Sequence, residues 1–243
     1  MVELRPRAGK AIEQFSFVDA LVAGLFEGAF SASAVHAAGD FGLGCGDALD
    51  GELVLLDGEL FRCPGAGGVV RVGPGELVPF AEVARFEPTH VQSVTGPIDE
   101  RSFEQLIDTL VPSANLFYAI RVDGEFDRMT VRDAVRQEQP YRGLADAVKD
   151  QRVASVTNTR GTMIGFRGPD VFQGLSVAEF HLHYLDEPRK FGGHVTDYDL
   201  VEGTLWIEAY ASFTVHLPEV ASYLAATLDS ADTDAQIRSA EST

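Results

Sequence analysis

Apolar and polar residues alternate through most of the segment 153–217, and this pattern constrains the fold more than any other feature of the chain. Runs such as T-L-W-I-E-A-Y-A-S-F-T-V have the period of two residues that half-buried β-strands require. Alternating runs also flank two turn-forming dipeptides, Asp57-Gly58 and Asp123-Gly124, which predicts the strand pairs 52–56 with 59–63 and 116–122 with 125–131. The pattern predicts a strand-rich α/β protein.

Helical spacing of apolar residues is confined to a few places. Apolar residues recur three and four positions apart at 18–26 and again at 103–110. Ser102 and Gln105 predict a capping box at the start of the second helix, and Pro112 predicts its end. We therefore expect few helices among many strands.

A helix-prone stretch, G-L-A-D-A-V-K-D-Q at 143–151, separates a mixed first half from the strand-like second half. This stretch is a plausible hinge, so we predict a division near residue 150. The expected units are an N-terminal mixed α/β region, 1–150, and a C-terminal strand-rich region, 151–243.

Half of the six histidines lie in one fourteen-residue stretch, as His181, His183 and His194. Side chains two apart on a strand project from the same face, so His181 and His183 can reach one point. The intervening D-E-P-R-K-F-G-G has the proline and glycines of a chain reversal, which would bring His194 back beside them. Three neutral imidazoles with an open fourth position are typical of catalytic zinc, whereas structural zinc usually has four ligands.

The other histidines carry no such pattern. A single histidine is more often a core or surface residue than a ligand. His36 falls in a predicted helix, and His90 and His216 fall in predicted strands. We interpret these three as structural.

Charge and cysteine content exclude several classes of partner. The chain has 19 Lys and Arg against 37 Asp and Glu, and its net charge of -18 would repel nucleic acid and anionic membranes. The first residues lack an apolar signal-peptide core, and no apolar run is long enough to span a membrane. Cys45 and Cys63 form neither a disulfide framework nor a CxxC site, which fits a reducing compartment. We therefore expect a cytoplasmic protein.

Three stretches together resemble the alpha-acetolactate decarboxylase family over nearly the full chain. They are G-D-F-G-L-G-C-G-D-A-L-D-G-E-L-V-L-L-D-G-E-L at 39–60, R-Q-E-Q-P-Y-R-G-L at 136–144 and F-H-L-H-Y-L-D-E-P-R-K-F-G-G-H-V at 180–195. The third stretch is highly specific. The resemblance implies a zinc lyase that converts 2-acetolactate to acetoin and carbon dioxide. It also implies a homodimer, with subunits of two packed mixed α/β regions and an active site at their interface.

The resemblance also assigns residues by position. It makes His181, His183 and His194 the zinc ligands, and it places the active-site glutamate on Glu52 and the arginine on Arg132. A further glutamate, from the C-terminal tail, falls on Glu241 through the short match I-R-S-A-E-S. Cys45 stands where the family usually has threonine, and a thiol is a poor hydrogen-bond donor.

The chemistry of the implied substrate explains, separately from the resemblance, why residues of these types are needed. Loss of carbon dioxide from a 3-keto acid leaves negative charge that zinc can stabilise as a Lewis acid. Arg132 can orient the carboxylate, and Glu52 or Glu241 can supply the proton that carbon must finally receive. Spacing alone cannot distinguish Glu52 from Glu59, since both follow Asp-Gly. Only the resemblance selects Glu52.

Two other functions remain compatible with the residues. The segment H-L-H-Y-L-D-E satisfies the H-x-H-x3-E half of a cupin signature, which indicates a metal oxygenase or isomerase. The second half is missing, since only His216 follows His194 and Val220 stands where asparagine is expected. The other alternative is a non-enzymatic zinc-stabilised binding module, which predicts a closed fourth coordination position.

Overall fold

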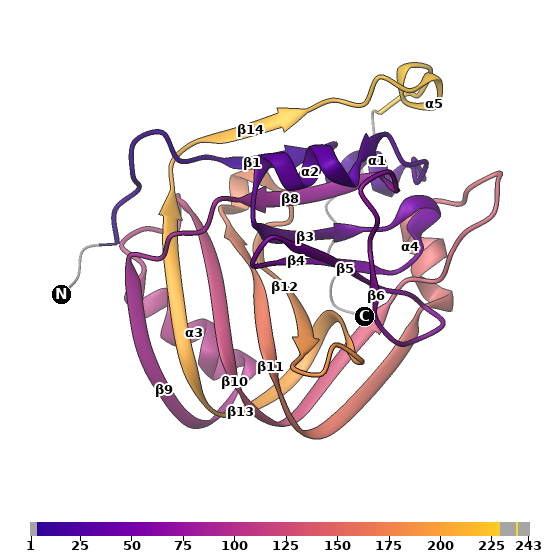
Figure 1. The fold of residues 1–243 in the computed structure, drawn as a ribbon. Coiled ribbons are helices and arrows are strands. Elements are labelled where there is room, and N and C mark those ends of the chain that lie inside the picture. Colours follow the sequence, from indigo (N-terminus) through magenta and orange to yellow (C-terminus); the bar gives the residue numbers. More distant parts are fainter. Residues whose placement is uncertain (1–3, 229–236, 238–243) are drawn as a thin grey trace.

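Two β-sheets make up most of the structure, a computed structural model in which residues 4–228 and 237 are described (Figure 1). The first has seven strands in the order β14-β1-β8-β3-β4-β5-β6: β1 (Ile12–Phe15), β3 (Phe41–Cys45), β4 (Glu52–Leu56), β5 (Glu59–Cys63), β6 (Val70–Arg71), β8 (Phe80–Ala84) and β14 (Phe213–His216). The second has five antiparallel strands in the order β10-β11-β12-β13-β9: β9 (His90–Asp99), β10 (Phe117–Asp133), β11 (Arg152–Gly168), β12 (Glu179–Asp186) and β13 (Gly192–Tyr210). The predicted strand-rich α/β fold with two packed sheets is confirmed.

The remaining elements are short, apart from one helix. A two-stranded pair joins β2 (Phe30–Ser31) to β7 (Leu77–Val78). The α-helices are α1 (Val18–Val22), α2 (Ala32–Ala38), α3 (Glu100–Leu110), α4 (Leu144–Ala147) and α5 (Ala221–Leu224). The 3-10 turns are η1 (Asp47–Leu49), η2 (Val148–Asp150) and η3 (Asp170–Phe172). No helix in the described part of the chain is long and apolar enough to cross a membrane.

The two sheets pack face to face through an apolar layer to which both contribute. Figure 1 shows the seven-stranded sheet lying across one end of the strongly curved five-stranded sheet. The first sheet buries Ile12, Phe41, Leu43, Val54, Leu56 and Phe61 against Phe117, Ala119, Ile164, Phe166, Leu185 and Tyr210 of the second. A separate core lies within the curve of the second sheet, where Phe103 and Ile107 of α3 are fully buried. Burial of apolar area at about 25 cal/mol per Å² is the main term holding these layers together.

One predicted hairpin is confirmed and the other is wrong. β4 and β5 pair around Asp57 and Gly58, whose positive φ angles of 52° and 75° are those of a tight hairpin turn. By contrast, β10 runs without a turn through Asp123 and Gly124, paired with β11 on one side and β13 on the other. Two long neighbouring strands supply more hydrogen bonds than a local turn would, so the ladder overrides the turn preference of the dipeptide.

Position 124 requires glycine because the five-stranded sheet bends tightly where β10, β11 and β13 pair at this position. It lies opposite Gly161 of β11 and Gly203 of β13. A Cβ added to Gly124 would lie 2.7 Å from the Glu202 carbonyl oxygen, and one added to Gly161 would lie 2.5 Å from that of Leu185. The glycines therefore serve close backbone approach in a bent sheet.

Two details of the predicted helices are also corrected. The first helix, α1, ends at Val22, because Gly24 adopts a positive φ of 83° and the backbone of Arg142 packs within 2.6 Å of where its Cβ would be. The N-cap of α3 is Asp99 rather than Ser102: the Asp99 side chain accepts a hydrogen bond of 2.8 Å from the Ser102 backbone N–H. The N-cap thus lies three residues before the predicted one, and the helix begins at Glu100. It ends two residues before Pro112, as expected.

The two sheets are not divided along the sequence at residue 150. β9 and β10 precede it and belong to the five-stranded sheet, while β14 follows it and returns to the seven-stranded sheet. The predicted hinge forms α4 and η2, which connect two paired strands of one sheet. Division of the chain into folding units at residue 150 stays a prediction.

A buried carboxyl in the first sheet gives a pH-dependent prediction. Glu82 is 1% exposed, accepts a hydrogen bond from the Ser176 hydroxyl and lies opposite Gln14, and burial raises its pKa to about 8. Because the unfolded chain ionises this group near its ordinary pKa, folding loses stability as pH rises from about 4.5 to 8. We expect Glu82→Gln to raise the free energy of unfolding by about 1–2 kcal/mol at pH 7 and to change it little at pH 4. Urea unfolding at both pH values measures this, and equal effects at the two pH values would contradict it.

Candidate active site

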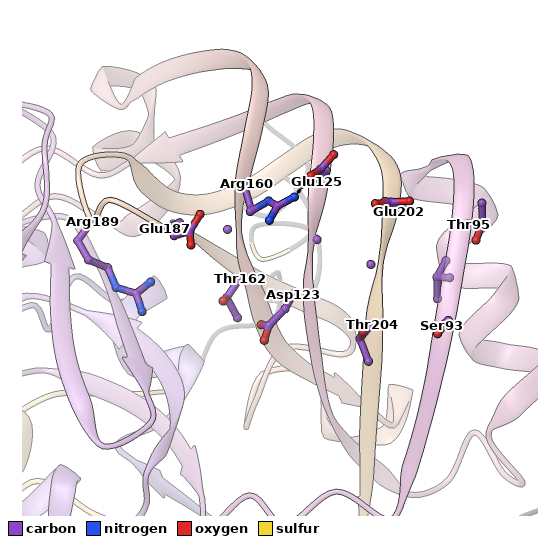
Figure 2. A pocket seen from close by; sticks show the side chains of 14 residues that line it. Ser93, Thr95, Asp123, Glu125, Arg160, Thr162, Glu187, Arg189, Glu202 and Thr204 are labelled. Carbon is purple, nitrogen blue, oxygen red and sulfur yellow. Dashed lines mark ion pairs between the residues drawn. The ribbon is translucent and has the colours of Figure 1, made fainter.

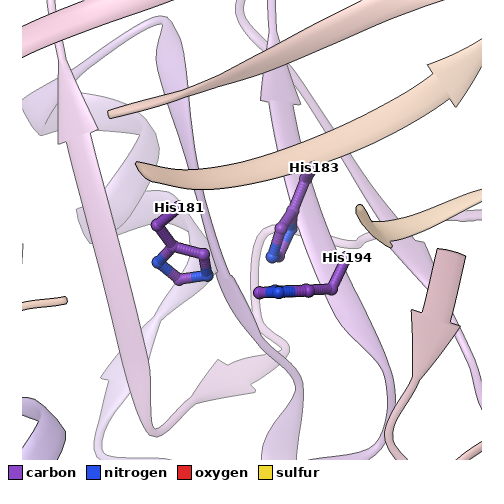
Figure 3. Close-up of side chains that lie close together, drawn as sticks. All are labelled: His181, His183 and His194. Atoms are coloured by element: carbon purple, nitrogen blue, oxygen red, sulfur yellow. The ribbon is translucent and has the colours of Figure 1, made fainter. Parts of the chain in front are cut away.

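The three histidines of the clustered motif converge as the sequence predicts (Figure 3). His181 and His183 project from one face of β12, and the reversal at 187–191 returns the chain so that His194 of β13 lies directly opposite His183. Their potential ligand atoms all lie within 4.8 Å of one another. The two-residue strand period and a single antiparallel register therefore build the cluster.

Burial keeps the three imidazoles neutral. All three rings are at most 8% exposed. Desolvation, together with the nearby charge of Arg132, lowers the pKa of His181 to about 3. The pKa values of His183 and His194 are also lowered well below the ordinary value, chiefly by desolvation. Neutral imidazole is the form that binds a metal, so no proton has to be displaced at neutral pH.

The hydrogen bonds of the cluster fit a bound cation. Nδ1 of His183 donates to the Leu53 carbonyl oxygen over 2.7 Å, which leaves the Nε2 lone pair facing the cluster. Within the described residues, His183 Nε2 and His181 Nδ1 are buried without a hydrogen-bond partner. Buried lone pairs without a donor are costly unless a cation satisfies them. The donor set therefore fits a metal ion.

Glu52 reaches the histidines from the other sheet. It lies at the start of β4, it is 8% exposed, and its Oε2 is 3.6 Å from His183 Nε2. The next residue, Leu53, supplies the carbonyl that orients the same imidazole. One short strand thus brings a carboxylate to the cluster and orients one of its rings.

A cysteine flanks this glutamate on each of the two neighbouring strands. Cys45 of β3 and Cys63 of β5 lie opposite Glu52 in the strand register. Burial raises the pKa of both thiols, and the charge of Glu52 raises it further. Both therefore stay protonated and act as small, weakly polar neighbours of the carboxylate.

Arg132 completes the polar side of the site. It lies near the end of β10, opposite His194, and is 4% exposed. Its guanidinium donates to His194 Nε2 over 3.0 Å and to the side-chain oxygen of Gln151 over 3.1 Å. A guanidinium held at this position presents a permanent positive charge beside the imidazoles.

The polar groups line a small pocket whose other lining residues are mostly apolar. The cavity measures about 50 Å³, and its polar lining residues are Glu52, Arg132, His181 and His194. The remaining walls are mostly apolar: Val18, Leu21, Cys45, Leu49, Phe80, Ala134, Leu144, Val148 and Val177. Ile237 is 1% exposed and packs in the same apolar cluster as these wall residues. Both sheets contribute, so the site lies at their interface, as expected.

Comparison with known proteins agrees with this geometry. The model of the alpha-acetolactate decarboxylase family matches residues 12–230. The chain belongs to this family. It is 37% identical over 230 residues to the alpha-acetolactate decarboxylase of Bacillus subtilis strain 168, covering 95% of this chain and 90% of the relative. It is 38% identical over 215 residues to that of Methylococcus capsulatus, covering 88% and 83%.

Solved structures show the same fold. The crystal structure of the Bacillus subtilis strain 168 alpha-acetolactate decarboxylase superimposes with a TM-score of 0.94 at 37% identity, covering 96% of this chain and all of that one. A Staphylococcus aureus protein described as similar to alpha-acetolactate decarboxylase superimposes with a TM-score of 0.93 at 28% identity, covering 95% and 100%.

The structure separates residues that the sequence left equivalent. The side chain of Glu59 is 48% exposed and pairs with Arg71, while Glu52 lies beside the histidines. Arg142 is likewise exposed and pairs with Asp150. The catalytic roles of Glu52 and Arg132 stay predictions, and both side chains line the same pocket as His181 and His194. Glu241 lies outside the described residues.

The cupin interpretation requires the glutamate of the half-motif to lie beside the histidines, and it does not. Glu187, the third residue of that half-motif, does not line the histidine pocket. It lines a larger polar cavity of about 510 Å³ on the five-stranded sheet, with Asp123, Glu125 and Arg160 (Figure 2). Glu125 and Arg160 form an ion pair there. None of the three clustered histidines lines this cavity, so its size does not make it the candidate active site.

Sequence reasoning missed two contributors to the site. Gln151 follows η2 and binds Arg132, and Leu53 orients His183 through its main chain. Any residue type can supply a main-chain carbonyl, so the identity of residue 53 gives no indication of this contact. The sequence around Gln151 is helix-prone and polar, which indicates a linker rather than a site.

Proposed function

We propose that this chain removes the carboxylate of 2-acetolactate as carbon dioxide and leaves acetoin, with Zn²⁺ as its metal. The observation that carries the proposal is the buried cluster of three neutral histidines, with Glu52 and Arg132 at the same pocket. Membership of the decarboxylase family supports the substrate. Three imidazole nitrogens support zinc, which proteins often hold this way in catalytic sites.

The metal and the arginine have separate tasks. Zn²⁺ held by His181, His183 and His194 would supply Lewis-acid stabilisation for the negative charge that develops as the carbon–carbon bond breaks. Arg132 binds and orients the substrate carboxylate, since its planar guanidinium can form two parallel hydrogen bonds to it. Too tight a grip on the carboxylate would stabilise the ground state, so orientation is the more productive role.

Glu52 is placed to handle the proton. When carbon dioxide leaves, the electron pair of the broken bond stays on the substrate, and carbon must then receive a proton to give acetoin. Glu52 lies 3.6 Å from His183 at the pocket wall, so it can deliver that proton from a fixed side. Delivery from one side would also determine the configuration of the new stereocentre.

The apolar wall suits the rest of the substrate. Val18, Leu21 and Phe80 offer contact to methyl groups and exclude water from the developing charge. A pocket of this size favours a substrate of few carbons. These apolar side chains supply no proton and no metal ligand, so the chemistry falls to the polar lining residues.

A single assay tests the function and the metal together. We expect the purified protein to convert 2-acetolactate to acetoin with release of carbon dioxide, and to lose activity when a chelator removes its metal. Restoration by stoichiometric Zn²⁺ is expected, with one zinc per chain by elemental analysis. Absence of acetoin from the metal-loaded protein would exclude the function, and full activity without metal would exclude the role of zinc.

Arg132→Lys is expected to lower kcat/KM by about 10²-fold while zinc stays bound. Lysine keeps the charge but loses the planar fork that orients a carboxylate. Steady-state kinetics with zinc analysis measures both. Arg142→Lys is the control, because Arg142 pairs with exposed Asp150, and it should behave like wild type. The reverse pattern would show that the wrong arginine has been assigned.

We also propose a cytoplasmic homodimer with no nucleic-acid or membrane partner. Both cysteines are buried and free of disulfides, which supports a reducing compartment. The charge of -18 supports the absence of nucleic-acid binding. Light scattering of the purified protein tests the dimer.

A further inference from the structure

Two consecutive residues of one strand, Arg132 and Asp133, are held by two consecutive residues of the neighbouring chain segment. Arg132 donates to Gln151 over 3.1 Å on the pocket side of β10. Asp133 points to the other side, is 1% exposed, and accepts from Arg152 over 2.7 Å. The end of β10 is therefore fastened on both faces by the dipeptide at 151–152.

The same segment also forms part of the pocket wall. Val148 of η2 and Leu144 of α4 line the pocket, three and seven residues before Gln151. Gln151 is thus presented from a short, anchored turn rather than from a free loop.

We propose that Gln151 is a positioning residue for Arg132, which acts by fixing the plane of the guanidinium toward the substrate carboxylate. This inference rests on the proposed function for the identity of that carboxylate. One guanidinium nitrogen donates to Gln151 and a second donates to His194 Nε2. A neutral imidazole has a single lone pair, so once His194 binds the metal it can no longer accept from Arg132. Of these two contacts, the one to Gln151 therefore persists and directs the guanidinium in the metal-loaded site.

The chemistry of the amide suits this role. Its oxygen accepts a hydrogen bond without adding negative charge beside Arg132. A carboxylate at the same position would compete with the anionic substrate for the guanidinium. Methionine has similar length but only a weakly accepting sulfur, so it removes the fixing contact while keeping volume.

The inference is tested with Gln151→Met, Gln151→Glu, Arg132→Lys and the double variant that combines Gln151→Met with Arg132→Lys. Activity is measured as kcat and KM. Binding is measured by calorimetry with 2,3-dihydroxy-2-methylbutanoate, an analogue whose ketone is reduced so that it cannot decarboxylate. Gln92→Met on the edge strand β9 is the control for the glutamine-to-methionine change. Zinc content and Tm are measured for every variant.

We expect Gln151→Met to lower kcat/KM about tenfold, as for loss of one hydrogen bond to a charged group, with zinc content kept. Gln151→Glu should raise KM and the analogue Kd at least about tenfold, because added negative charge repels the anion. In the Arg132→Lys background, Gln151→Met should change either quantity less than about twofold, because lysine has no plane to fix. Gln92→Met should match wild type.

Full, independent losses in the double variant would overturn the inference, since Gln151 would then act on the fold rather than through Arg132. Wild-type behaviour of both Gln151 variants, or failure of the wild-type protein to bind the analogue, would overturn it as well. Failure of the proposed function looks different. If the wild-type protein binds the analogue but makes no acetoin, the proposed function is wrong. The analogue Kd values of the single and double variants would then still test the role of Gln151.

Discussion

His183→Ala is expected to abolish metal binding and to lower acetoin formation by at least about 10³-fold, because a three-imidazole site keeps little affinity with two ligands. His183 is fully buried and its Nδ1 is fixed by the Leu53 carbonyl, so no neighbouring imidazole can take its position. Zinc per chain is measured by elemental analysis, and turnover by acetoin formation.

His216→Ala is the matched control for this prediction. His216 lies on β14, its side chain is 42% exposed, and it pairs with Glu13 rather than with the cluster. This variant should keep its zinc and its activity. A His183→Ala protein that retains full zinc and turnover would show that the metal, if bound, lies elsewhere.

Those parts of the fold that depend on local period and turn chemistry were predictable. Residues two apart on a strand share a face whatever the strand packs against, which is why His181 and His183 meet. The reversal before His194 and the turn at Asp57-Gly58 follow from proline and from residues that tolerate positive φ. The family resemblance added Glu52 and Arg132, which spacing alone did not select.

What depends on long-range pairing was not predictable. The dipeptide Asp123-Gly124 has the chemistry of a turn, yet β10 runs through it, because two strands distant in sequence pair along both sides. The contact of Leu53 with His183 joins residues 130 positions apart through a main-chain oxygen, which any residue would supply. Gln151 meets Arg132 only because β10 and β11 are neighbours in the same sheet. In each case the partner is determined by the topology rather than by nearby sequence.

Glu52→Gln is expected to cut decarboxylation, or the enantiomeric purity of the acetoin, by about 10²-fold, which is typical for removal of a general acid. The substitution preserves volume and removes only the proton that can be delivered to carbon. Zinc should stay bound, because three imidazoles hold the metal and the Glu52 oxygen lies 3.6 Å from the nearest of their nitrogens rather than in their place. Chiral gas chromatography of the product measures both rate and configuration.

Glu59→Gln tests whether this effect belongs to the position or to the residue type. Both glutamates follow Asp-Gly and both begin a strand, but Glu59 is half exposed and pairs with Arg71. It should therefore change neither rate nor configuration by more than about twofold, since exposed ion pairs contribute little. If Glu59→Gln were defective while Glu52→Gln kept normal turnover and product purity, the acid would have to be reassigned. The metal cluster would be unaffected, because the histidines are built by β12 and β13 independently of either hairpin turn.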